Sequence, residues 1–150
     1  ILMMKEEDWD SVIDTNLKSV FNMSKAVASV LVRQRQGGSI LNISSISGVV
    51  GMAGQTNYAA SKAGIEGLTR VQAIELAKSG ITVNCIAPGY FDAGMISTVD
   101  KNQQQQIIDN IPVGRLGNPE ELAECILYLC SKGGKYVTGQ IFHNNGGLYI

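Results

Sequence analysis

Hydrophobic residues recur at helical spacing in three long stretches of the chain, and a short apolar run rich in β-branched residues follows each stretch. The expected helices span residues 6–35, 57–78 and 118–131. The expected strands span residues 39–44, 81–87 and 137–143. Helices and strands that alternate at this spacing predict an α/β fold, in which right-handed crossovers join a parallel sheet that is covered by helices on both faces.

Glycine, proline and capping residues mark the ends of these elements. Gly37 and Gly38 end the first helix, and Gly80 ends the second. Asn118 as the N-cap, with Pro119 in the first turn, begins the third helix. Because ligands bind beyond the carboxyl ends of parallel strands, the loops that follow the first two strands are expected to carry the chemistry.

Residues 90–112 show a weaker pattern than the rest of the chain. They contain four consecutive glutamines, Gln103–Gln106, which are too few to form a low-complexity segment. We interpret this stretch as a short exposed helix or lid on the substrate side of the predicted site.

Composition narrows the class of protein. With 150 residues, 45% of them hydrophobic, the chain fits a single domain over residues 1–150 that buries its own core. Its 12 basic and 13 acidic residues argue against binding to nucleic acid or to an anionic membrane through bulk charge. No apolar run approaches the roughly 20 residues that span a bilayer, and no signal-peptide pattern opens the chain.

The cysteines and the single histidine narrow the chemistry further. The three cysteines are odd in number and lack metal-ligand spacing, so we interpret them as reduced thiols of a cytoplasmic protein. One histidine, His143, leaves little room for a His-based metal site or a Ser-His-Asp triad. We therefore expect no metal centre.

Three residues near the predicted sheet edge form a candidate acid–base unit. Tyr58 and Lys62 lie four residues apart on one face of a helix, although such a pair alone is as often an ordinary surface pair. Ser45 follows the end of the first predicted strand, and a glycine-rich loop returns the chain to Tyr58. An ammonium near a phenol favours the phenolate, and a serine hydroxyl stabilises negative charge on a carbonyl oxygen. A hydride source is missing, which a bound cofactor would supply.

Asn16 is a polar residue on the apolar face of the first predicted helix, between Ile13 and Val20. Burying an unpaired amide costs roughly 1–3 kcal/mol. Either a neighbouring backbone group or a water bonds this amide, or Asn16 has a role in the site.

Together, five short motifs resemble the short-chain dehydrogenase/reductase family, and the resemblance extends from about Lys5 to Tyr149. The motifs are Thr15-Asn16-Leu17, Asn42-Ile43-Ser44-Ser45, Tyr58-Ala59-Ala60-Ser61-Lys62 with Ala63-Gly64, Val83-Asn84, and Ala87-Pro88-Gly89.

The resemblance implies a catalytic tetrad made of Asn16, Ser45, Tyr58 and Lys62. Tyr58 would be the general acid in reduction and the general base in oxidation. Lys62 would favour its phenolate form, and both residues would bind the nicotinamide ribose. Ser45 would orient the substrate carbonyl, and Asn16 would hold a water that relays protons to Lys62.

The resemblance also implies which residues line the cofactor and the substrate. The Pro88–Gly89 loop would run past the nicotinamide of NADP, or of NAD, and the backbone near Phe91 would bond its carboxamide. Gln55 and Tyr90 would face the substrate. Ala93 stands where the family usually has a threonine that bonds the cofactor's amide.

The segments Gly114–Gly117 and Asn145–Tyr149 are most similar to bacterial-type 3-oxoacyl-acyl-carrier-protein reductases of fatty acid biosynthesis. The expected reaction is the NAD(P)-dependent reduction of a 3-oxoacyl thioester to the 3-hydroxyacyl thioester. A short-chain dehydrogenase that acts on acetoacetyl-CoA, a sugar or a polyol is an alternative within the enzyme class. A non-enzymatic nucleotide-sensing module, or an inactive truncated fragment, is the alternative outside it.

The family's glycine-rich Thr-Gly-x-x-x-Gly-x-Gly turn does not occur in this sequence, which begins at Ile1 without a cap or turn. We therefore interpret residues 1–150 as the C-terminal, catalytic half of a Rossmann-like doubly wound domain. Wide apolar surfaces on the first two helices predict a homodimer or homotetramer. Arg35 and Lys78 are candidate contacts near the cleft for an acidic carrier protein, although two such residues are more often ordinary surface charges.

Overall fold

The computed structural model describes the backbone of residues 1–150 and every side chain except those of Met95 and Ser97. Three parallel strands form one sheet in the order β1-β2-β3. Their bounds are β1 Gly38–Ile43, β2 Ile81–Pro88 and β3 Ile141–Asn144. The register places Asn42 opposite Cys85, and Cys85 opposite Ile141.

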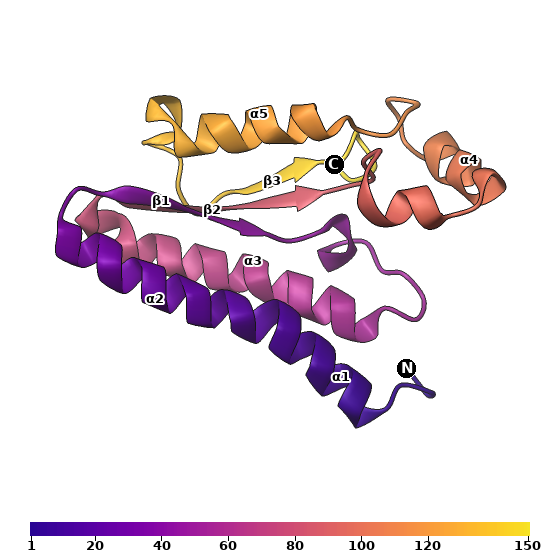
Figure 1. Ribbon diagram of the computed structural model, residues 1–150, viewed down its shortest axis with the longest axis horizontal. Helices are drawn as coiled ribbons and strands as arrows, with labels where there is room; N and C mark the ends of the chain where they lie inside the picture. Colours follow the sequence, from indigo (N-terminus) through magenta and orange to yellow (C-terminus); the bar gives the residue numbers. More distant parts are fainter.

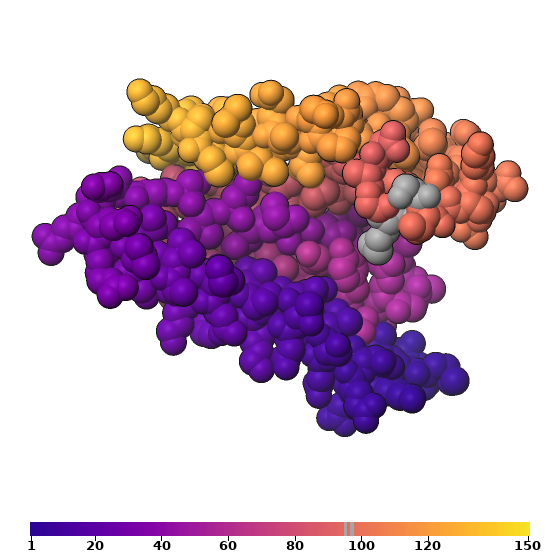
Figure 2. Space-filling view, in the orientation of Figure 1, coloured from indigo at the N-terminus to yellow at the C-terminus, as the bar shows by residue number. Residues whose placement is uncertain are grey.

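Helices cover both faces of this sheet, as the sequence predicted. Helices α2 (Ser19–Gln34) and α3 (Thr56–Leu76) lie on one face, and α5 (Pro119–Cys130) lies on the other (Figure 1). In the space-filling view, the N-terminal helices and α5 form opposite sides of the molecule with the strands between them (Figure 2). The α/β, Rossmann-like fold class is therefore confirmed.

The first predicted helix is a single rod interrupted by one unusual turn. Helix α1 (Glu6–Ile13) continues through a π-helical segment, η1 (Asp14–Lys18), into α2. Single π-helical turns inside α-helices often occur at functional sites, and this one contains Asn16. The rod ends at Arg35, which adopts a left-handed φ of 54°.

Gly37 and Gly80 are in close contact just before β1 and β2 begin. The two strands therefore start side by side, with Gly38 paired to Ile81. Gly37 has a φ of +71°, and a Cβ there would lie 2.6 Å from the carbonyl oxygen of Gly80. Gly38 N donates to that same oxygen at 3.2 Å. Only glycine fits at Gly37, because both the backbone angle and the space exclude a side chain.

The core lies between the sheet and the α2–α3 layer. Ile40, Ile81, Val83 and Ala73 form a buried cluster. Ala28, Leu31 and Leu76 pack against it from the helices. On the opposite face of the sheet, Leu129 of α5 is buried.

The last strand is shorter than predicted, because side chains replace its first ladder bonds. The sequence predicted a strand over 137–143, but β3 begins at Ile141. Asn84 Nδ2 donates to Val137 O at 2.7 Å, and Asn84 Oδ1 accepts from Gln140 N at 3.1 Å. Thr138 Oγ1 accepts from Val83 N at 3.0 Å. These bonds satisfy the backbone without regular strand pairing.

The remaining short elements lie mostly around the carboxyl ends of the strands. They are η2 (Ile46–Gly48), η4 (Gly94–Thr98) and α4 (Lys101–Asp109), while η3 (Ala77–Ser79) and η5 (Lys132–Gly134) lie at the other end. Among the described helices, none combines the length and the apolar character needed to cross a bilayer.

Candidate active site

A cavity of about 660 Å³ opens beyond the carboxyl ends of β1 and β2. The segments after these strands form one wall with Ser45, Gly89 and Tyr90, and the start of α3 adds Tyr58. The facing wall belongs to η4 and α4, where the side chain of Ile107 lines the space. The loops after β1 and β2, which were expected to carry the site, therefore line a cavity. The short helix expected within residues 90–112 is α4 (Lys101–Asp109).

Tyr58 and Lys62 lie on the first turns of α3 and face the same side. The Lys62 ammonium nitrogen lies 5.6 Å from the centroid of the Tyr58 ring. Lys62 Nζ also donates to the carbonyl oxygen of Ile43, the last residue of β1, at 3.1 Å. The helix is held at its start because Asn57 Oδ1 accepts from Tyr58 N at 2.8 Å while Asn57 Nδ2 donates to Asp8 O at 3.0 Å.

Burial lowers the pKa of Lys62 below the usual lysine value, because desolvation disfavours the charged form. The Cys85 thiol has a smaller, opposite effect on this pKa. Cys85 is fully buried in β2 beneath the site. Its own pKa rises to about 11, chiefly through desolvation, so the thiol is protonated at neutral pH.

Ser45 is the second residue after β1 and the first of this segment to line the cavity. Its neighbour Ser44 is buried, whereas Ser45 is partly exposed and lines the cavity. Ser45 Oγ accepts a hydrogen bond from Ser47 N at 3.2 Å and so caps η2. The fold thus brings Ser45 and Tyr58 to one cavity, with Lys62 beside Tyr58.

Asn16 reaches the same helix from the π-helical turn. Asn16 Nδ2 donates to Ser61 Oγ at 3.2 Å, and Ser61 Oγ donates to Tyr58 O at 2.7 Å. Ser61 is fully buried, and it lies between Tyr58 and Lys62 in the sequence of α3. The amide of Asn16 is therefore bonded by a neighbouring side chain, which was not among the partners that the sequence suggested.

The segment after β2 is held close to the end of β3. A Cβ at Gly89 would lie 2.7 Å from Asn145 Cβ, and a Cβ at Gly117 would lie 2.6 Å from the Phe91 ring. Gly117 N donates to Tyr90 O, and Asp92 N donates to Gly117 O, so the Phe91 amide takes no part in this bridge. Gly89, Tyr90 and Phe91 all line the cavity.

Gln55 and Tyr90 both line the cavity, where the resemblance placed the substrate side. Tyr90 Oη lies 3.6 Å from Met52 Sδ, so the loop before α3 closes one side of the space. The sequence interpretation missed Met52, and also missed Glu66, a buried carboxylate two turns after Tyr58. The sequence did contain a signal for Glu66, because its spacing places it on the same helix face as Lys62 and Thr69.

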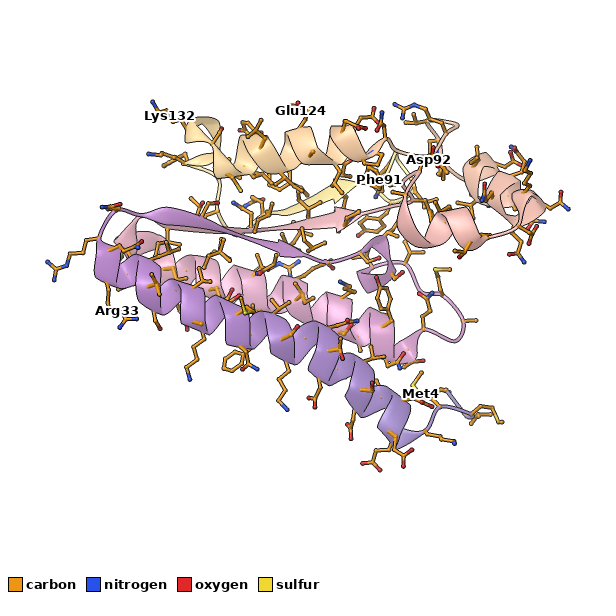
Figure 3. All side chains as sticks on the ribbon, in the orientation of Figure 1. Met4, Arg33, Phe91, Asp92, Glu124 and Lys132 are labelled. Carbon is orange, nitrogen blue, oxygen red and sulfur yellow. The ribbon has the colours of Figure 1, made fainter. Side chains whose placement is uncertain are left out.

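Arg35 and Lys78 do not lie near the cleft, so that expectation was wrong. Both precede strands, at the end of the sheet where β1 and β2 begin, whereas the cavity lies where the strands end. Figure 3 shows this separation, with Arg33 near the end of α2 far from Phe91 and Asp92 (Figure 3). Helices that return the chain antiparallel to each strand place their last residues opposite the ligand edge.

The donor set fits a nicotinamide ribose and a polarised carbonyl. An ammonium offers three N–H donors, and the bond to Ile43 uses one of those of Lys62. The phenol of Tyr58 and the hydroxyl of Ser45 each donate or accept. Among the described side chains, no group of three or more His, Cys, Asp or Glu residues could hold a metal ion.

A parallel sheet that presents serine, tyrosine and lysine at its ligand edge defines a class of oxidoreductases. The chain belongs to the short-chain dehydrogenase/reductase family, since the family described as enoyl-(acyl carrier protein) reductase matches residues 1–149.

Similar curated proteins narrow the relationship further. The 3-oxoacyl-(acyl-carrier-protein) reductase FabG of Thermotoga maritima is 48% identical over 150 residues. The proteins of the same name from Staphylococcus epidermidis and Vibrio harveyi are 45% and 42% identical. In each comparison the whole chain aligns with 61% of the relative, so this chain spans about three fifths of the length of these relatives.

Proposed function

We propose that this chain is the catalytic portion of an NAD(P)-dependent reductase that converts a 3-oxoacyl-acyl-carrier-protein thioester to the 3-hydroxyacyl thioester. The observation that carries the proposal is the convergence of Ser45 and Tyr58 on one cavity, with Lys62 beside Tyr58. The similarity to the FabG proteins supports the choice of substrate.

The residues divide the reaction between them. Ser45 Oγ donates to the keto oxygen and stabilises the charge that grows on it. Tyr58 Oη gives its proton to that oxygen, and the Lys62 ammonium stabilises the phenolate that remains. When bound, a reduced nicotinamide supplies the hydride that the keto carbon receives. Asn16 holds the water that returns a proton towards Lys62.

Tyr58 and Lys62 would bind the ribose of the cofactor, and the Pro88–Gly89 segment with the backbone near Phe91 would hold the nicotinamide. We propose NADP as the cofactor, with NAD as the alternative. We further propose that residues 1–150 form one catalytic portion, and that residues outside it bind the pyrophosphate of the cofactor. The relatives extend beyond the aligned chain, which covers 61% of their length, and this supports the last point.

Gln55 and Tyr90 would contact the substrate from the cavity wall. The facing wall combines the apolar side chains of Ile96, Val99 and Ile107 with the amides of Gln103, Gln106 and Asn110. The apolar part would contact an acyl chain. The similarity to the FabG proteins, and not the lining by itself, favours a thioester over the alternative substrates, which are sugars and polyols. Acetoacetyl-CoA stays open, since its acyl group has the same chemistry.

The test is the reduction of an acetoacetyl thioester by NADPH, which is measured as the loss of NADPH absorbance at 340 nm. We expect turnover with the thioester, none with sugars, and a loss of at least about 100-fold in Tyr58→Phe, which removes only the acidic hydroxyl. Equal turnover of Tyr58→Phe and wild type would contradict the proposal. The intact mass of the sample shows whether the polypeptide tested is the 16.0 kDa chain or a longer one. Lack of activity in a 16.0 kDa polypeptide would support the alternative of an inactive fragment.

We also propose a cytoplasmic homodimer or homotetramer that pairs the outer faces of α2 and α3. Val71 and Ile74 on α3 are 55% and 79% exposed, and Phe21 on α2 is 48% exposed. Ile65, in contrast, is fully buried in the chain's own core and is not available for pairing. Sedimentation of wild type as a monomer at micromolar concentration would exclude this assembly.

A further inference from the structure

Glu66 is a buried carboxylate that the proposed reaction does not use. It lies on α3 one turn after Lys62, and its side chain is 6% exposed. Arg70 approaches Oε2 at 3.6 Å, but the Arg70 side chain is itself 57% exposed. Such a loose, solvated pair adds little stability.

The stronger partner of Glu66 is the segment that carries Ser45. Ser44 Oγ lies 3.1 Å from Glu66 Oε1 and 3.0 Å from Lys62 O, so these two acceptors on α3 share its one hydroxyl donor. The turn after Ser45 also rests on this carboxylate. A Cβ at Gly48 would lie 3.2 Å from Glu66 Oε1 and 3.1 Å from Ala63 N.

Glu66 therefore bonds one end of the short segment 44–48 and packs against its other end. Ser45 lies between these two anchors. Burying a carboxylate has a cost in free energy that an apolar residue at the same place would avoid. Ile65 next to it is fully buried without any such cost. Stability alone therefore does not explain a carboxyl side chain at this position.

We propose that Glu66 is a positioning residue that fixes the Ser45 hydroxyl relative to Tyr58, by holding residues 44–48 on α3 through Ser44. The inference rests on the proposed reductase function for its effect on turnover. Its effect on the mobility of the segment does not depend on that function. A residue with this role changes kcat more than the free energy of unfolding, because it orients a group that acts only in the reaction.

The test compares Glu66→Met with Glu66→Gln in the full-length protein. Methionine keeps the length of the side chain and removes the acceptor, whereas glutamine keeps an oxygen that accepts from Ser44. For Glu66→Met we expect hydrogen–deuterium exchange at residues 44–48 to accelerate about fivefold or more, and kcat to fall about tenfold. The Tm should be unchanged or higher. Glu66→Gln should keep both rates within about twofold of wild type.

Ser44→Ala removes the donor and should accelerate exchange in the same segment, which tests the link even if a Glu66 variant does not fold. Glu75→Ala removes an exposed carboxylate of α3 and should change neither readout. The inference is overturned if exchange at 44–48 is unchanged in Glu66→Met, or if Glu66→Gln behaves like Glu66→Met. If wild type does not reduce thioesters, the proposed function fails, and the exchange data alone decide the role of Glu66.

Discussion

The Lys62 ammonium donates a hydrogen bond to the carbonyl oxygen of Ile43, with 3.1 Å between the two atoms. Ile43 ends β1, and the next residues are Ser44 and Ser45. A side chain of α3 is thus fixed to the strand that delivers the serine. The bond restrains the long lysine stem and leaves its other N–H groups for ligand hydroxyls.

We expect Lys62→Met to separate activity from stability. Methionine matches the apolar stem and removes a charge that burial disfavours, so Tm should change by less than about 3 °C. The kcat should fall about 100-fold or more, since the cation that stabilises the phenolate is lost. Lys78→Met, at an exposed position of η3 just after α3, is the control and should leave the NADPH oxidation rate unchanged.

Gly89→Ala tests the close contact behind the cavity. The added methyl would lie 2.7 Å from Asn145 Cβ and 2.8 Å from Asn145 Cα, so the backbone of one segment must move. We expect a loss of about 1–3 kcal/mol in the free energy of unfolding by urea. Gly51→Ala, where a methyl meets nothing within 4 Å, should stay within about 0.5 kcal/mol of wild type. Equal effects of the two substitutions would contradict the described packing.

The Asn16–Ser61 bond predicts a measurable coupling between two helices. Asn16→Ala and Ser61→Ala should each destabilise the protein, and the double variant should lose less than the sum. A coupling free energy of about 0.5–1.5 kcal/mol is expected from urea unfolding of all four proteins. Strict additivity would show that the two side chains do not interact.

Gln104 connects α4 to the segment before it. Its Nε2 donates to Ile96 O and to Val99 O, each at 2.8 Å. Gln104→Ala should loosen the wall of the cavity and raise the KM for the acyl thioester about three- to tenfold, with a smaller effect on kcat. Gln105→Ala is the matched control, because Gln105 bonds only the exposed Asp109 among its described contacts. A kcat effect without a KM effect would argue against this role.

Glu121 should contribute to the loss of folding stability at acidic pH. Bonds from Arg115, and then from Asn118 N, lower the pKa of Glu121 to about 2 from 4.5. Between these values the unfolded chain binds more protons, so stability falls as pH decreases from 4.5 towards 2. Glu121→Gln should show a flatter dependence of Tm on pH over this range, while Glu124→Gln should follow wild type.

The fold was predictable because periodicity, caps and glycines agreed along most of the chain. Gly37 lies two residues after Arg35, the left-handed C-cap of α2, and Gly80 caps the 3-10 segment that follows α3. Asn118 caps α5 as predicted. The start of β3 was not predictable, since it depends on side-chain bonds from Asn84, which is far away in sequence. The π-helical turn around Asn16 likewise leaves no periodic signal in a short stretch.

The site was predictable where spacing along one helix determines it, as for Tyr58 and Lys62. The end of the first predicted strand placed one hydroxyl of Ser44 or Ser45 at the ligand edge, and the family resemblance singled out Ser45, which lines the cavity. The partner of Asn16 was not predictable, because Ser61 meets it only when two helices pack. Arg35 and Lys78 were misplaced although the predicted alternation of helices and strands already puts the last residues of each helix at the sheet end opposite the ligand edge.

The two walls of the cavity are built in different ways. The serine, tyrosine and lysine side stands on buried strands and on α3, whereas the facing side is a separate excursion of the chain between β2 and α5, held partly by Gln104. Chemistry and substrate choice therefore depend on different stretches of the gene. Under the proposed function, substitutions in residues 98–110 would alter the substrate side of the cavity and leave Ser45, Tyr58 and Lys62 in place.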